Sequence, residues 1–159
     1  MATDKQPMTL SGKFKLEEEL KNLLQVERPQ VIRAIEDARG HGDLSENADY
    51  DAAKERQAFV EARIAEIQGK LVSAEVVDPK EIKSDRVVFG ATVALQDLDS
   101  DEEVTYQIVG EDEANVKEGK ISVFSPLARS IIGKRNGDHI EFKSPKGERE
   151  YEILSFKFI

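Results

Sequence analysis

The sequence predicts an α+β protein: an N-terminal antiparallel α-helical hairpin of coiled-coil type, followed by a small antiparallel β-sheet domain with one short helix. Two observations lead to this fold class. Apolar residues recur at helical spacing from about Ser11 to Ala74, whereas apolar and polar residues alternate beyond Asp78-Pro79. A chain of 159 residues suffices for two small modules, each with a thin core. We therefore expect residues 1–79 to form the hairpin and residues 80–159 a globular domain.

Two apolar seams predict the hairpin. The second seam follows the alternating four-three spacing of one helix side, at Ala53, Gln57, Val60, Ile64, Ile67, Leu71 and Ala74. The first is rougher, with Glu27 interrupting Leu20, Leu24, Val31, Ala34 and Ala38, and with Leu16, Leu23 and Ile35 beside it. The short break Gly40-His41-Gly42 separates the two runs. Since Pro29 has no backbone N–H, we expect a kink or short break near Arg28.

The C-terminal half predicts two β-hairpins around one short helix. The first hairpin pairs residues 91–95 with 104–108, and the second pairs HIEFK with EREYEILSFKF across a turn that contains Pro145 and Gly147. Between them, Ser125 is a candidate N-cap, Pro126 the first helical residue and Gly133 the stop. Six aromatic residues are expected in the core: Phe89, Phe124, Phe142, Tyr151, Phe156 and Phe158.

Composition excludes several functions. A net charge of -9 repels phosphate backbones, so contact with DNA or RNA should be local and weak, or arranged by a partner. The chain has no cysteine and only two distant histidines, which argues against disulfides and against a transition-metal site of its own. It has no apolar run of the roughly 20 residues that span a bilayer. We expect a cytoplasmic monomer with no membrane partner and no small-molecule substrate.

The stretch HGDLSENADYDAA, residues 41–53, permits two interpretations. In the structural one, Asp43 or Ser45 caps the second helix, and acids in its first turn complement the helix dipole. In the functional one, Asp43 and Glu46 face the same way and remain ionised, as ligands of Mg²⁺ must be. Two carboxylates alone make an incomplete Mg²⁺ site, so the remaining ligands would come from another macromolecule. The two interpretations are compatible.

Several separated motifs resemble the Gre family of bacterial transcript cleavage factors, and its GreA type in particular. They run in the same order and at the same spacing from Met8 to Phe158: PMTLSG, ERPQVIRAI, ARGHGDLSENADYDAAKERQAF, VVFGATVALQDLDSDEEVTYQIVGEDEA and ISVFSPLARSIIGK. The resemblance implies a coiled coil followed by an FKBP-like domain. It also implies that the globular domain docks on RNA polymerase near the mouth of the secondary channel, and that the coiled coil enters this channel.

The resemblance further implies the function of a transcription elongation factor. In the family, the tip acids, here Asp43 and Glu46, help to hold a second Mg²⁺ in the polymerase active site. The polymerase then cleaves the backtracked transcript, whose 3′ end has been extruded, and the arrested complex is rescued. The factor would not be an enzyme and would bind no cofactor alone. Its partners would be RNA polymerase and the nascent RNA 3′ end.

Other tip residues are assigned by the same resemblance. Ser45 stands where many members have lysine, and Asp51 where many have histidine, so the tip is more acidic here. Asn47 and Tyr50 match the family and are given supporting roles, either orienting the loop or hydrogen-bonding near the metal, with helix-start packing as the alternative. His41 is expected to have a structural role at the turn.

Three basic residues, Arg39, Lys54 and Arg56, lie near the tip in sequence. Arg39 and Lys54 match family positions that face the extruded RNA, and clustered charges can bind phosphates even on an acidic chain. The alternative is ordinary ion pairing on the helix surface, with Asp51 or Glu55 as partners.

Two rival functions remain open. A regulator of the same fold could occupy the channel without promoting cleavage, or while inhibiting it. A prolyl isomerase or chaperone is suggested only by the FKBP-like fold, and fold analogy is a poor guide to activity.

Overall fold

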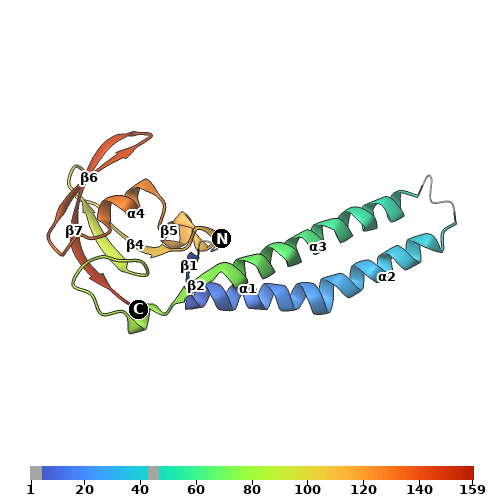
Figure 1. Ribbon diagram of the computed structural model, residues 1–159. Helices are drawn as coiled ribbons and strands as arrows, with labels where there is room; N and C mark the ends of the chain where they lie inside the picture. Colours follow the sequence, from blue (N-terminus) through green and yellow to red (C-terminus); the bar gives the residue numbers. More distant parts are fainter. Residues whose placement is uncertain (1–4, 43–46) are drawn as a thin grey trace. The chain divides into compact units, whose positions relative to one another are not determined.

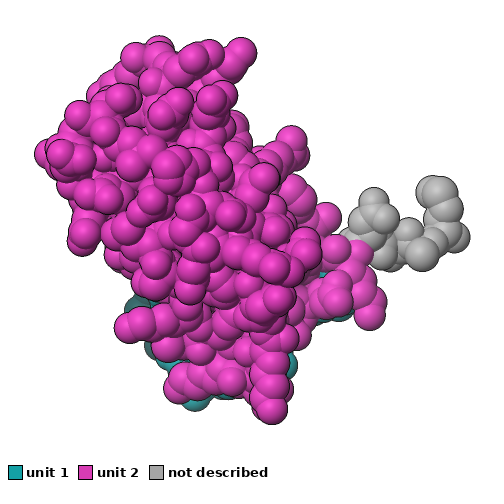
Figure 2. Space-filling view, turned by 90° about the vertical axis from the view of Figure 1, so that its left-hand side faces the viewer, with its two compact units in different colours: residues 1–4, 13–74 teal, residues 5–12, 75–159 magenta. Residues whose placement is uncertain are grey.

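The computed structural model describes residues 5–42 and 47–159. Contacts divide this chain into two compact units, which have different colours in Figure 2. Among the described residues, unit 1 comprises 13–42 and 47–74, and unit 2 combines 5–12 with 75–159. The boundary predicted at residues 79 and 80 stays a prediction. The compact units differ from it because residues 5–12 and 75–79 group with the globular part.

Unit 1 is an antiparallel helical hairpin (Figure 1). Its first arm consists of α1 (Leu10–Asn22), a π-helical segment η1 (Leu23–Glu27) and α2 (Arg28–Arg39), and its second arm is α3 (Ala48–Ser73). The buried residues between the arms are Leu23, Val31, Ile35 and Ala38 on one side and Ala53, Val60, Ile64 and Ile67 on the other. The predicted hairpin is therefore confirmed, and its second seam is buried largely as expected.

The π-helical segment changes the phase of the first seam. The chain does not break ahead of Pro29: the backbone stays in the right-handed helical region, and Arg28 N–H donates to the carbonyl of Leu23. A π turn inserts one extra residue into the helix. The buried residues Leu23 and Val31 are therefore eight positions apart, instead of the seven positions of a regular heptad spacing. Of the kink or short break expected near Arg28, the break is thus wrong, while the helix does have its π-helical irregularity directly before Arg28.

The same phase shift corrects the predicted first seam. Ile35, predicted to lie beside the seam, is 7% exposed and belongs to it. Leu23 is buried in the same way, whereas Ala34, predicted within the seam, is exposed. Leu16, Leu20 and Leu24 pack against the buried cluster and are partly exposed.

Unit 2 contains a five-stranded sheet of order β5-β4-β3-β7-β6. Its strands are β3 (Thr92–Asp97), β4 (Glu103–Val109), β5 (Lys120–Ser122), β6 (His139–Ser144) and β7 (Gly147–Lys157). The antiparallel pairs β3–β4 and β6–β7 confirm both predicted hairpins, and β3 also pairs antiparallel with β7. Strand β5 runs parallel to β4, so the sheet is not wholly antiparallel as predicted.

The remaining elements are short. A separate two-stranded sheet joins β1 (Gln6–Thr9) to β2 (Ala74–Val77), and neither strand was predicted. In the part of the chain that the structure describes, 3₁₀ turns follow at η3 (Pro79–Glu81), η4 (Glu111–Glu113) and η5 (Val116–Glu118). The helix α4 (Pro126–Ile131) forms as predicted, because the Ser125 hydroxyl accepts a hydrogen bond from Ala128 N–H.

The core of unit 2 lies against the sheet. Its fully buried members include Val87, Val93, Leu95, Ile108, Ile131 and Ile153. Four of the aromatic residues predicted for the core pack at its margin, partly exposed: Phe89, Tyr151, Phe156 and Phe158. Phe124 was predicted to be buried and is 45% exposed, so that prediction is wrong.

A carboxylate clasp holds residues 5–12 within unit 2. Glu113 accepts hydrogen bonds from Thr9 N–H at 3.0 Å, from the Thr9 hydroxyl, and from Gly110 N–H at 2.8 Å. The Thr9 hydroxyl oxygen accepts in turn from Gly12 N–H at 3.1 Å, which caps the start of α1. A Cβ atom on Gly12 would overlap the Glu113 side chain, so the clasp requires glycine there.

Candidate functional site

The predicted catalytic pair, Asp43 and Glu46, lies outside the described residues, and so does Ser45. The chain on either side of them is described. Helix α2 ends at Arg39 and α3 begins at Ala48, so the structure defines the two helix ends that flank the predicted acids. The assignment of the pair stays a prediction.

Helix α2 ends in a short turn. Gly40 N–H donates to the carbonyls of Glu36 and Asp37, and His41 N–H donates to that of Ala38 at 3.2 Å. Gly42 has φ +100°, in the left-handed region that suits glycine. These bonds satisfy the last carbonyls of α2 and terminate it, as the Gly-His-Gly pattern predicted.

Asn47 connects the two helix ends. Its Oδ1 accepts a hydrogen bond from Tyr50 N–H at 3.0 Å, which caps α3, and its Nδ2 donates to the carbonyl oxygen of Ala38 at 2.6 Å. The residue is only 9% exposed. The N-cap of α3 is thus Asn47, whereas Asp43 and Ser45, considered for this role from sequence, lie outside the described residues. Asn47 caps α3 because it directly precedes Ala48 in extended backbone geometry, with its side chain in reach of a free N–H.

Tyr50 and the nearby charges have structural neighbours. Tyr50 is half-buried and packs against the seam of the hairpin. His41 Nδ1 lies 3.7 Å from Asp49 Oδ2, a partner that the sequence analysis did not identify. Because both of these side chains are mostly exposed, solvent screens the pair and its contribution to stability is small. Asp51 is exposed in the first turn of α3.

The three basic residues differ in their contacts. Arg39 is exposed in the last turn of α2. Lys54 is exposed and donates to the side-chain oxygen of Gln57 at 3.1 Å. Arg56 forms an ion pair with Glu27 on the other arm, with Nη2 and Oε1 3.0 Å apart, and not with the local acids considered from sequence. A role in RNA contact stays a prediction for all three.

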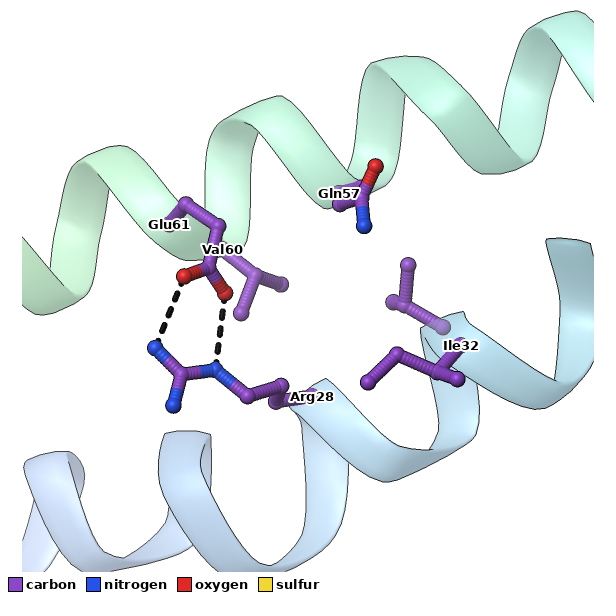
Figure 3. Close-up of a pocket in the computed structure, with 6 residues that line it drawn as sticks. Arg28, Ile32, Gln57, Val60 and Glu61 are labelled. Carbon is purple, nitrogen blue, oxygen red and sulfur yellow. Dashed lines mark hydrogen bonds and ion pairs between the residues drawn. The ribbon is translucent and has the colours of Figure 1, made fainter.

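A groove lies between the arms beside the π-helical segment (Figure 3). It has a volume of about 200 Å³ and is lined by Arg28, Val31, Ile32, Gln57, Val60 and Glu61. Arg28 and Glu61 form a bidentate pair across it, with N–O distances of 2.8 and 2.7 Å. The hydrogen bond from Arg28 lowers the pKa of the Glu61 carboxyl. Since the Glu61 carboxylate is already paired with Arg28, it is a poor candidate for a metal ligand.

No group of three or more histidine, cysteine or acidic residues that could hold a metal ion occurs within residues 5–42 and 47–159. The predicted Mg²⁺ ligands fall in the gap between these ranges. Their chemistry suits the ion, because Mg²⁺ prefers carboxylate oxygens and takes few of them from any one protein. Within these described ranges, no helix has both the length and the apolar character needed to span a bilayer.

Comparison with known protein families matches both halves of the chain. Residues 6–76 match the model described as transcription elongation factor, N-terminal, and residues 82–158 match that of transcription elongation factor, GreA/GreB, C-terminal. Transcription elongation factor GreA of Alkalilimnicola ehrlichii is 57% identical, covering 97% of this chain and 98% of its own. The factor of the same name from Neisseria meningitidis is 54% identical, and the match covers 96% of this chain and 98% of that protein.

Solved structures also match over most of their length. The GreA factor homolog 1 of Thermus thermophilus is 27% identical, covering 96% of this chain and 98% of its own, with a TM-score of 0.44. A GreA/GreB elongation factor from Nitrosomonas europaea is 23% identical and has a TM-score of 0.43. The match covers 97% of this chain and 100% of that one.

Proposed function

Because the chain belongs to the GreA/GreB family of transcription elongation factors, we propose that it binds RNA polymerase and stimulates cleavage of a backtracked transcript. The tip of the hairpin enters the secondary channel, and unit 2 docks at its mouth. Cleavage removes the extruded 3′ segment of the RNA and leaves a new 3′ end that the polymerase can extend.

One observation supports this proposal more than any other. Asp43 and Glu46 fall in the segment that joins the far ends of two long helical arms. The 26 residues of α3 span about 39 Å at about 1.5 Å per residue. An arm of that length can deliver two carboxylates into a channel too narrow for a globular domain.

The chemistry asked of this chain is limited. Asp43 and Glu46 offer carboxylate oxygens to a metal ion whose other ligands come from the polymerase and the RNA. When bound there, Mg²⁺ supplies an activated water and stabilises the charge on the leaving oxygen. The chain holds its two acids in position and is inert without the polymerase. The hydrolytic activity therefore belongs to the polymerase.

The contact with RNA is assigned to exposed cations near the tip. Arg39 and Lys54 can bind phosphates of the extruded segment, because Arg39 is exposed in the last turn of α2 and Lys54 is exposed in the second turn of α3. Arg56 contributes less to RNA binding, because its guanidinium is held by Glu27 of the opposite arm.

The test is a purified elongation complex stalled with its transcript backtracked. The wild-type factor should shorten the transcript and restore elongation, while the double variant Asp43→Ala/Glu46→Ala should still compete for polymerase without stimulating cleavage. A matched control replaces two exposed acids farther along the arms, Asp37→Ala/Glu55→Ala, and should cleave normally. If the wild-type factor slows the intrinsic cleavage of the polymerase, the chain is an inhibitory channel regulator and the proposal is wrong.

A further inference from the structure

The groove between the arms of the hairpin has an apolar floor and partly polar walls (Figure 3). Val31 of α2 and Val60 of α3 form the floor, and each is only 2% exposed. Ile32, which is 44% exposed, forms part of one wall. Because Ile32 is so exposed, the groove presents an apolar surface, and covering it with a ligand is favourable.

Gln57, on the opposite wall, turns a hydrogen-bond donor toward the groove. Its Oε1 accepts a hydrogen bond from Lys54 Nζ at 3.1 Å. This bond orients the amide, and the Gln57 Nε2 points toward α2 (Figure 3). The same bond brings the exposed ammonium group of Lys54 to the rim of the groove. This wall therefore combines a donor with a positive charge.

The pair of Arg28 and Glu61 lies at one end of the groove (Figure 3). Its two hydrogen bonds, of 2.8 and 2.7 Å, hold the Arg28 guanidinium in a fixed plane. Bases of single-stranded RNA stack on guanidinium planes of this kind. Because Arg28 and Glu61 neutralise each other, the charge at the rim is that of Lys54.

We propose that this groove binds one unpaired nucleobase of single-stranded RNA, in the segment extruded from a backtracked polymerase. The base covers the apolar floor, one of its carbonyl oxygens accepts from Gln57 Nε2, and a neighbouring phosphate pairs with Lys54. The size fits, because a cavity of about 150 Å³ holds benzene and the groove has a volume of about 200 Å³. This inference rests on the proposed function, since the RNA reaches the groove only when the hairpin enters the secondary channel.

A nucleobase matches the groove better than a protein side chain does. Its faces are apolar and its edge carries carbonyl acceptors, so it suits both the floor and the Gln57 donor. An aliphatic side chain would cover the floor but would leave this donor without an acceptor. A carboxylate would accept from Gln57 and attract Lys54, but it would lose water against the apolar floor.

The groove lies well along the arm from the helix start. Gln57 is about 14 Å along α3 from its first residue, Ala48, at about 1.5 Å per residue. A short extruded segment therefore ends before the groove, whereas a long one reaches it. The groove should thus contribute only in complexes that have backtracked far.

Two substitutions remove the two features separately. Gln57→Glu replaces the donor with a carboxylate that repels phosphate, and Ile32→Ala removes the apolar wall. Gln30→Glu is the control for the first, because it makes the same change of charge at an exposed residue of α2 that does not line the groove. Val26→Ala is the control for the second, because Val26 is 45% exposed and does not line the groove either.

The experiment measures the affinity of the full-length factor for two purified elongation complexes, one with a long extruded RNA segment and one that is not backtracked. Mg²⁺ is left out, so that the transcript is not cut. Gln57→Glu and Ile32→Ala should each weaken binding to the backtracked complex by about 2- to 10-fold and leave binding to the other unchanged. Both controls should bind like the wild type. In the wild type, 4-thiouridine in the extruded segment should crosslink within residues 28–32 or 57–61.

Three results would overturn the inference. One is wild-type affinity of both groove variants for the backtracked complex. Another is an equal loss of affinity for both complexes, which would place a polymerase side chain in the groove instead of RNA. The third is a crosslink confined to other residues, a result that needs no variant. If the wild type binds neither complex, the proposed function itself fails, and the groove loses its ligand with it.

Discussion

The two units of the chain are stabilised in different ways. In unit 2, residues from the sheet and from α4 form a core whose central members, such as Leu95 and Ile153, are fully buried. In unit 1, a single seam between two arms is flanked by exposed or half-exposed ion pairs: Arg28–Glu61, Arg56–Glu27 and Arg63–Glu19. The globular unit is thus held by one core that draws on several elements, and the arm that carries the predicted acids by one apolar seam with ion pairs beside it.

The largest loss of stability is expected in the core of unit 2. Leu95→Ala should lower the free energy of unfolding by about 2 to 5 kcal/mol, since a fully buried side chain leaves a cavity. Urea titration followed by tyrosine fluorescence reports mainly on this unit, because two of the three tyrosines, Tyr106 and Tyr151, lie in it. Val116→Ala, at a side chain 67% exposed, is the control and should change stability by less than about 0.5 kcal/mol. A loss below about 1 kcal/mol for Leu95→Ala would contradict the described core.

A smaller loss is expected in the seam of unit 1. Ile67 is also fully buried, but it belongs to the apolar cluster of the helical hairpin, whose arms can close on a cavity more easily than a sheet can. Ile67→Ala should cost about 2 kcal/mol, at the low end for such substitutions. Thermal melting followed by helical circular dichroism measures it. A loss as large as that of Leu95→Ala would remove the difference between the units.

The carboxylate clasp should contribute less than either apolar core. Glu113→Gln keeps the size of the side chain but removes the charge that strengthens its bonds to Thr9 and Gly110. We expect a cost of about 1 kcal/mol, because a hydrogen bond to a charged group contributes about 1.5 to 3 kcal/mol and one to a neutral group about 0.5 to 1.5 kcal/mol. Hydrogen exchange at the amides of Thr9 and Gly110 should become faster. Unchanged exchange at both amides would mean that the clasp does not hold residues 5–12.

The smallest effect is expected at the ion pair between Arg63 and Glu19. The hydrogen bond from Arg63 lowers the pKa of Glu19. The pair therefore stabilises the fold above the usual glutamate pKa of about 4.3, and this stability is lost as pH falls through the lowered native pKa. Since both side chains are partly exposed, Arg63→Gln should cost less than about 1 kcal/mol at pH 7.

Thermal melting of the wild type and of Arg63→Gln, at two pH values and two salt concentrations, measures the contribution of this ion pair. The difference in melting temperature between the wild type and Arg63→Gln should shrink below pH 4. It should also shrink in 1 M salt, because the Debye length is then only about 3 Å and the salt screens the pair. A difference that grows on acidification would have the wrong sign for a carboxylate with a lowered pKa.

Long periodic segments made most of the fold predictable. The hairpin, the two β-hairpins and the helix capped by Ser125 each follow from a repeated spacing or a recognised turn. Strand β5 has three residues and strands β1 and β2 have four, too few to show a period. The π turn did leave a signal, since the first seam moves by one position between Leu23 and Val31. From sequence, that irregularity was described only as Glu27 interrupting the seam, with Leu23 and Ile35 beside it.

At the candidate site, the sequence suggested residues but not the contacts that the structure shows for the described ones. Asp43 and Glu46 were identified from local chemistry and from resemblance, and their structure lies outside the described residues. Asn47 was identified too, but its bond to Ala38 spans a turn without periodicity. The pair of Arg56 and Glu27 joins residues on opposite arms, so it depends on the register between the arms, which local sequence does not determine.

The central claim is that this chain stimulates cleavage through Asp43 and Glu46, and single-turnover cleavage tests it most directly. The measurement compares polymerase alone, polymerase with wild-type factor, and polymerase with Asp43→Ala/Glu46→Ala, each factor at a concentration that saturates binding. The account predicts that the wild type accelerates cleavage and that the double variant gives the rate of polymerase alone. A double variant as fast as the wild type would contradict it.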